Sequence, residues 1–297
     1  MKCRLLLLCL FLTACDKGQE ESLPQDAQAM YEHAQALLKP NVKGEQSDFK
    51  GAMEWTLKAA EGGYLQAQLD MGGIYLNGGR GVAPDVAKAY YWFCRAAEQG
   101  SAQAEVFVGM LLYDGQGVQR DQAAALQHWR KAADAGVAEA QFRLGRVLAQ
   151  SPDTAEEGLA LLEQAARPNE RGGVPQAATA LGNIYFQGRS GVAKDVERAV
   201  EWYARGATAG DPMAQHVYGL MLLSGEPVPQ NAERGLAMLR LAAGQDYLPA
   251  MQLLIQILRN GPDAAAHESE SEAWNKRLTE LQNGGSQGAF AEKSDKK

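Results

Sequence analysis

The chain has 297 residues, with 29 basic and 36 acidic side chains and a formal net charge of −7. An acidic chain of this kind argues against nucleic acid as a partner, because binding to phosphates requires basic patches. The sequence contains no His-Glu-x-x-His zinc helix and no Gly-Lys-Ser/Thr phosphate loop, so we expect neither a metal nor a cofactor and predict that the chain is not an enzyme.

The first residues have the layout of a secretory signal. Lys2 and Arg4 precede the apolar run 5–12, which is too short to cross a bilayer and is followed by Thr13-Ala14-Cys15. Residues 12–15 resemble a bacterial lipobox, in which the cysteine is lipidated and becomes the first mature residue. We therefore predict a signal peptide at 1–14, and a palmitate-bearing Cys15 with a polar tether at 15–25.

Lipidation at Cys15 places the mature protein in the cell envelope, facing the periplasm. Removal of 1–14 leaves 27 basic against 36 acidic side chains, a formal charge of −9, and Cys94 as the only other cysteine. A single thiol forms no internal disulfide, so the fold must be held by packing. Asp16 resembles the residue that retains some lipoproteins at the inner membrane, which we favour over the outer membrane.

An internal repeat organises the rest of the chain. Alanines recur at intervals of 36 or 37 residues, and a glycine follows each of the first five alanines after five residues. A periodic unit of this length indicates stacked helical hairpins, because one hairpin cannot bury its apolar face alone. The alanines are Ala67, Ala104, Ala140, Ala177, Ala214 and Ala250, and the glycines are Gly72, Gly109, Gly145, Gly182 and Gly219.

A second helix is expected after each of these segments. Asp121, Asp195 and Asn231 are suitable N-cap residues, and Thr154 with Glu157 forms a candidate capping box. Bulky residues followed by paired small residues predict the stripe that packs between helices. These bulky residues are Trp55, Trp92, Trp202 and Met238, with His128 at the same position of the third unit.

The repeated motifs resemble the Sel-1-like repeat family, which is related to the tetratricopeptide repeats. The motifs are Ala67-Gln68-x-x-x-Gly72-x-x-Tyr75-x-x-Gly78, the loop 115–118, and Trp92-x-x-x-Ala-Ala-Glu, and the match covers about residues 48–261. The resemblance implies an all-α, right-handed α-solenoid of about seven antiparallel helical hairpins over residues 26–282. We interpret 167–173 as a lengthened loop within a hairpin.

The two ends of the repeat array are degenerate, at 26–39 and 247–282. Near the C-terminus, Trp274, Leu278 and Leu281 are spaced to cover the last hairpin while Glu268, Glu270 and Glu272 face water. Such terminal units are needed to cap an open stack. The composition turns to Gly, Ser and Lys from Asn283, which predicts a disordered tail at 283–297.

Positions that vary between repeats are free to bind a partner, whereas recurring positions serve stacking. In tetratricopeptide relatives the helix that carries the repeated glycine lines a concave groove, and the resemblance implies the same here. The predicted groove combines aromatic, arginine and apolar side chains, which are enriched in interfaces. Its residues are Val106, Met110, Tyr113, Phe142, Arg146, Asn183, Phe186, His216 and Leu220.

These features favour a membrane-anchored adaptor that binds a protein partner in the envelope through its repeat groove. Two alternatives follow from the family resemblance. One is an immunity protein that neutralises a periplasmic phospholipase effector of a type VI secretion system. The other is a scaffold of an exopolysaccharide export complex.

Overall fold

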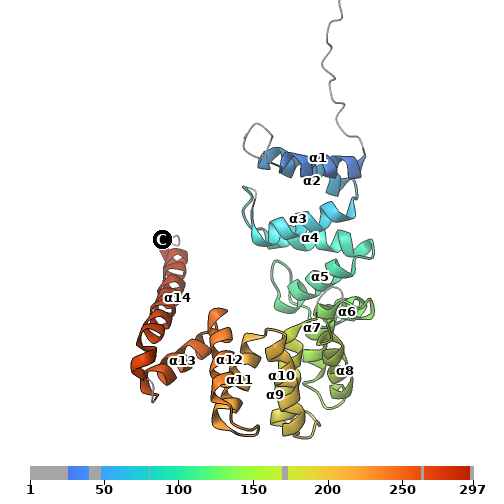
Figure 1. Ribbon diagram of the computed structural model, residues 1–297. Helices are drawn as coiled ribbons and strands as arrows, with labels where there is room; N and C mark the ends of the chain where they lie inside the picture. Colours follow the sequence, from blue (N-terminus) through green and yellow to red (C-terminus); the bar gives the residue numbers. More distant parts are fainter. Residues whose placement is uncertain (1–25, 40–47, 80, 169–172, 262–263, 295–297) are drawn as a thin grey trace, which may run out of the picture. The chain divides into compact units, whose positions relative to one another are not determined.

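The computed structural model describes residues 26–39, 48–79, 81–168, 173–261 and 264–294, with side chains described as far as 283. The described chain is α-helical, with one 3-10 turn (Figure 1). It falls into two compact units, 1–96 and 97–297. The predicted signal peptide, Cys15 and the tether lie outside the described residues. None of the helices in the described part is long and apolar enough to cross a bilayer.

The first unit contains two hairpins, and the last residues of its fourth helix pass into the second unit. Its core is formed by small residues and Met71, with Trp92 buried against them. Alanines at these contacts let the helix backbones approach closely. The helices are α1 (Ala27–Leu37), α2 (Phe49–Glu61), α3 (Leu65–Asn77) and α4 (Val86–Glu98).

The second unit contains five hairpins in which each odd-numbered helix packs against the even-numbered helix that follows it (Figure 1). The prediction of about seven antiparallel hairpins is therefore confirmed for the described residues. The helices are α5 (Ala102–Asp114), α6 (Gln122–Asp134), α7 (Ala138–Leu148), α8 (Ala155–Ala165), α9 (Pro175–Gln187), α10 (Val196–Thr208), α11 (Pro212–Ser224), α12 (Ala232–Gly244), α13 (Leu248–Asn260), the 3-10 helix η1 (Ala264–His267) and α14 (Glu268–Ser294).

In α5 and α9 the repeated glycine makes room for a bulky residue of the even helix that follows. A Cβ atom at Gly109 would lie 2.5 Å from the Trp129 ring, and one at Gly182 would lie 2.8 Å from the Tyr203 ring. Both rings are almost fully buried. The glycine is therefore required by close packing inside the hairpin.

This contact corrects the predicted packing stripe by one residue. In α10 the sequence pointed to Trp202, whereas Tyr203 is the residue that fills the space at Gly182. In α6 the position was assigned to His128, whereas Trp129 is buried at Gly109. One residue turns the side chain by about 100° around a helix, which is enough to move it from the surface into the contact.

The glutamine that follows the repeated alanine in three of the repeats connects one hairpin to the previous one. Its Nε2 donates a hydrogen bond to a carbonyl near the end of the preceding even helix, where four carbonyls have no partner within the helix. The three bonds are Gln68 to Ala60 at 3.1 Å, Gln141 to Ala133 at 3.4 Å, and Gln215 to Ala207 at 3.2 Å.

Helix ends agree with the predicted caps except in α8. The side chains of Asp121, Asp195 and Asn231 each accept a hydrogen bond from the backbone N–H three residues on. Thr154 makes no side-chain cap bond, so the predicted capping box is wrong; its hydroxyl instead donates to the Leu148 carbonyl at 2.7 Å. The side chain of Glu157 on α8 instead forms an ion pair with Arg130 of α6.

The C-terminal cap is formed as predicted by Trp274, Leu278 and Leu281, which pack against the core of α12 and α13. Glu270 departs from expectation because it forms an ion pair with Arg240, with two hydrogen bonds of 2.7 and 2.9 Å. The backbone of α14 is helical to Ser294, beyond the start of the expected tail at 283, and that tail stays a prediction.

The loop at 167–173 has a different place from the one expected. It follows α8 and precedes α9, so it connects two hairpins and does not lie within one. Residues 169–172 are outside the described part of the chain.

Candidate functional site

The predicted groove residues lie on the first helices of four of the five hairpins in the second unit, α5, α7, α9 and α11. We call the exposed side of these helices the odd-helix face. α9 contacts both α7 and α11, so these three helices are neighbours. The face is therefore continuous over three hairpins.

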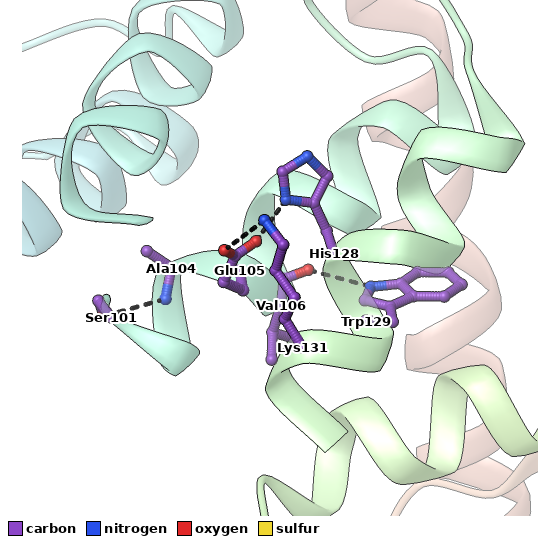
Figure 2. A network of polar contacts seen from close by, with 7 residues as sticks. All are labelled: Ser101, Ala104, Glu105, Val106, His128, Trp129 and Lys131. Atoms are coloured by element: carbon purple, nitrogen blue, oxygen red, sulfur yellow. Dashed lines mark hydrogen bonds and ion pairs between the residues drawn. The ribbon is translucent and has the colours of Figure 1, made fainter. Parts of the chain in front are cut away.

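Residues three positions before each repeated glycine point toward the interior. Val106 is only 3% exposed, and its carbonyl accepts a hydrogen bond of 3.2 Å from the Trp129 indole (Figure 2). Phe142 packs against the core between α7 and α9. Position −3 lies about 60° around the helix from the glycine, on the side of the hairpin contact. Val106 is thus a core residue and not a groove residue.

The other residues predicted on α5 also serve packing. Met110 and Tyr113 are partly buried against the cluster that contains Trp129, and the Tyr113 and Trp129 ring centroids are 5.0 Å apart. Both side chains keep part of their surface open to solvent. The α5 end of the face is consequently less open than its α7–α11 part.

His216 does not join the other predicted residues. Its ring lies against Tyr247 of the next hairpin, with centroids 5.6 Å apart. The buried Nδ1 atom has no hydrogen-bond partner among the described residues, and burial lowers the pKa of the imidazole. A neutral ring in an aromatic contact indicates a role in stacking α11 on α13.

The structure brings Arg146 and Asn183 together in a hollow of about 470 Å³ between α7 and α9. We call it the basic hollow. Arg146 lies 5.4 Å above the Phe142 ring, which holds its guanidinium at the rim. The remaining lining residues are Ala149, Gln150, Ala180, Ile184, Gln187, Arg189 and Ser190.

Phe186 and Leu220 meet in a second hollow, of about 460 Å³, between α9 and α11. We call it the apolar hollow. Phe186 is 41% exposed and Leu220 is 40% exposed, which is unusual for side chains of this size. Val196, Val217, Met221, Ser224, Glu226 and Pro227 complete its lining.

One polar network escaped the sequence analysis. Glu105, only 7% exposed, contacts the His128 ring and lies 3.3 Å from the Lys131 ammonium (Figure 2). Its position holds glutamine in three other repeats, so the signal was the replacement of an amide by a carboxylate. Because a buried carboxylate requires charged or hydrogen-bonding partners, His128 and Lys131 account for it structurally. Among the described residues, no group of three His, Cys, Asp or Glu side chains could hold a metal ion.

A larger hollow of about 740 Å³ lies on the even helices, between α8 and α10. Trp202 and Arg205 line it, with the guanidinium 4.7 Å above the indole. Arg167 and Pro168, at the start of the loop between hairpins, also line it. The odd-helix face contains the predicted residues, whereas this hollow contains none of them.

Hairpins closed by recurring glycine contacts and joined to one another by recurring glutamine bonds define a helical-repeat protein of the α-solenoid class. A family model described as Sel1 repeat matches residues 27–64, 65–101, 102–137, 138–167, 175–211 and 212–247. The chain belongs to the Sel1 repeat family. The match begins at residue 27, so the first hairpin is a family repeat and not the degenerate end unit that its motifs suggested.

Three known proteins are similar to this chain. A Sel1 repeat protein from Oxalobacter formigenes has a similar structure, with a TM-score of 0.69 and 24% identity, covering 86% of this chain and 98% of that one. Chitin synthase regulatory factor 3 of Schizosaccharomyces pombe is 27% identical over 193 residues, which is 65% of this chain and 17% of that protein's length. An immunity protein from Pseudomonas aeruginosa matches at a TM-score of 0.45 and 22% identity, covering 77% of this chain and 84% of that one.

Proposed function

We propose that this chain is an adaptor that binds a protein partner on the odd-helix face of its second unit. The observation that carries the proposal is the pair of neighbouring hollows on α7, α9 and α11, which contain four of the residues predicted from repeat variability. Family membership supports the same role, because Sel1 repeats mediate protein–protein interactions. Fold alone would not be sufficient, since function depends on the site.

The apolar hollow supplies the energetic argument. Burying a fully exposed large apolar side chain contributes about 1.5–3 kcal/mol, and Phe186 and Leu220 are each about 40% exposed. Both lie in a hollow between two helices, where a partner side chain would contact several neighbours at once. Interface hot spots have this arrangement of an apolar pocket with a polar rim.

Truncation of the apolar hollow tests the proposal. We expect Phe186→Ala and Leu220→Ala to weaken capture of an envelope partner by about 1 kcal/mol or more each, as hot-spot truncations do. The matched control is Leu241→Ala, which removes an equally large side chain that is 52% exposed on α12, outside the face. Binding would be measured by pull-down with mass spectrometry and then by titration, with circular dichroism as a check on folding.

Two results would contradict the proposal. The first is unchanged binding by the Phe186 and Leu220 variants. The second is a loss of binding on substitution of Trp202 or Arg205, which would move the site to the hollow between α8 and α10.

We further propose that Cys15 carries lipid and holds the adaptor in the cell envelope, facing the periplasm, with the inner membrane favoured over the outer. The layout of residues 1–15 supports this proposal. The narrower alternatives, an immunity protein against a phospholipase effector and an export scaffold, differ in their partner. Capture of a lipase would favour the first, and capture of a polysaccharide synthase or porin the second.

A further inference from the structure

The basic hollow has a charge that is unusual for this chain. The protein is acidic overall, with 36 acidic and 29 basic side chains, yet no Asp or Glu lines this hollow. Arg146 on α7 and Arg189 in the loop after α9 both line it and are both exposed. Neither has an ion pair among the described residues, whereas five other arginines of the second unit do.

Asn183 adds oriented donors to the two guanidinium groups. Its Oδ1 accepts a hydrogen bond of 2.7 Å from the Tyr203 hydroxyl. Burial raises the pKa of Tyr203 to about 12, so the hydroxyl keeps its proton and continues to donate. Because the amide oxygen is occupied in this way, the Nδ2 donors of Asn183 remain for a ligand in the hollow.

The backbone around the hollow is held in place across two hairpins. The Ser190 hydroxyl donates a 2.9 Å hydrogen bond to the Gln150 carbonyl, which connects the loop after α9 to the end of α7. Ser190 has a positive φ of 53°, a backbone conformation that is uncommon for a non-glycine residue. The loop that carries Arg189 is therefore fixed beside Arg146.

We propose that the basic hollow binds a carboxylate side chain of an extended segment of the protein partner, while an apolar side chain of the same segment enters the apolar hollow. The inference rests on the proposed function and names the chemistry of the partner. Guanidinium groups and amide donors that converge on one hollow match the acceptor geometry of a carboxylate.

The separation of the two hollows sets the spacing of the two partner side chains. Both hollows adjoin α9, one on the side of α7 and the other on the side of α11. We take the centres of the two hollows to be about one packed-helix spacing apart, which is about 8–10 Å. A polyproline II segment rises about 3.1 Å per residue with three residues per turn, which places residues i and i+3 on one side about 9 Å apart.

The probe is a fluorescein-labelled, proline-rich peptide with aspartate at position i and leucine at position i+3. We expect saturable binding to the full chain in detergent, and about tenfold weaker binding for Arg146→Glu and for Arg189→Glu, since a charge-assisted bond is lost. A peptide with asparagine in place of aspartate should also bind about tenfold more weakly. Raising the salt concentration should weaken the aspartate peptide and leave the asparagine peptide little changed.

Arg259→Glu is the matched control. Arg259 and Arg146 both lie in the last turn of an odd helix, so the two variants change the net charge and the helix end in the same way. We expect Arg259→Glu to bind the peptide as the wild type does. Phe186→Ala should weaken the leucine peptide and leave an alanine-substituted peptide unaffected.

Several outcomes would overturn this inference. They are the absence of saturable binding at millimolar peptide, equal losses for Arg146→Glu and Arg259→Glu, and arginine-dependent binding to phosphatidylglycerol vesicles in place of the peptide. If binding of the envelope partner requires Phe186 and Leu220 but not Arg146 and Arg189, the adaptor proposal is supported and the proposed carboxylate site is contradicted.

Discussion

At the scale of single residues, the hairpins depend on a pairing between a glycine and a bulky side chain. Gly109 faces Trp129 and Gly182 faces Tyr203, so the two helix backbones approach more closely than an alanine would allow. Gly73, one residue after the repeated glycine of α3, has open space around it. The repeated glycine is therefore retained for packing, and its neighbour has no such restriction.

This difference predicts opposite effects for the same substitution at two glycines. Gly182→Leu should lower the melting temperature, because overpacking of the Tyr203 contact costs about 1–3 kcal/mol. Gly73→Leu should leave stability unchanged or slightly increased, since leucine is the better helix former by up to about 1 kcal/mol. Thermal unfolding followed by circular dichroism measures both. If the two variants melt alike, the glycines are not packing positions.

The same scale explains the error of one residue in the packing stripe. Trp202 and Tyr203 are adjacent aromatics, and so are His128 and Trp129. A periodic pattern shows that one of two neighbours is buried, but their side chains differ only by the 100° step of the helix. The partner glycine decides between them, and its direction depends on the crossing of the two helices.

At the scale of helices, the last element is held by charge as well as by packing. Arg240 of α12 pairs with Glu270 of α14, and Arg277 of α14 pairs with Asp246 in the loop before α13. The guanidinium groups lower the pKa of both carboxyl groups. The two partners are 30 residues apart in sequence in the first pair and 31 in the second, so both pairs connect α14 to an earlier part of the chain.

A lowered carboxyl pKa predicts loss of stability in acid. Because the folded-state pKa of Glu270 lies below its ordinary value of about 4.3, its contribution is fully present above that value and is lost as the pH falls through the folded-state pKa. Glu270→Gln should therefore lower the urea midpoint at pH 7 and have a smaller effect at pH 3. The free energy of unfolding should fall by up to about 1 kcal/mol at pH 7, since the Arg240–Glu270 pair is partly exposed.

Glu272→Gln is the control for this effect. Glu272 lies on the same helix and is exposed, and the structure shows no ion pair for it. Its substitution should leave the urea midpoint within error at both pH values. A pH-independent loss in Glu270→Gln would mean that the side chain does not act through its charge.

At the scale of the whole molecule, the repeat explains what the sequence predicted and what it did not. Helix boundaries and caps recur every 36 or 37 residues, so they were visible without an alignment. Arg146, Asn183, Phe186 and Leu220 were found because they vary at positions facing away from the stack. Val106 was misplaced because position −3 turns toward the even helix.

Arg189 was missed for a different physical reason. It follows Gly188, the C-cap of α9, and so lies outside the helix, in a loop that is bound to the carbonyl of Gln150. The hollows themselves form between side chains of different hairpins. A repeat pattern predicts how the two helices of one hairpin pack against each other. It does not predict the spaces between hairpins, because these depend on residues from two different repeats.

The attachment of the whole chain to a membrane is tested at Cys15. Cys15→Ala should abolish incorporation of labelled palmitate and leave a precursor that migrates more slowly, because a lipobox is cleaved only when its cysteine carries lipid. Cys9→Ala is the matched control within the same segment and should be labelled and processed normally. Fractionation should find wild type and Cys9→Ala with the membrane. Several acyl chains on one cysteine hold a protein on a bilayer almost permanently, at about 0.8 kcal/mol per buried methylene, so a salt wash should not release either protein. Normal labelling of Cys15→Ala would contradict the proposed lipid anchor at Cys15. The proposed binding face would then still be tested separately.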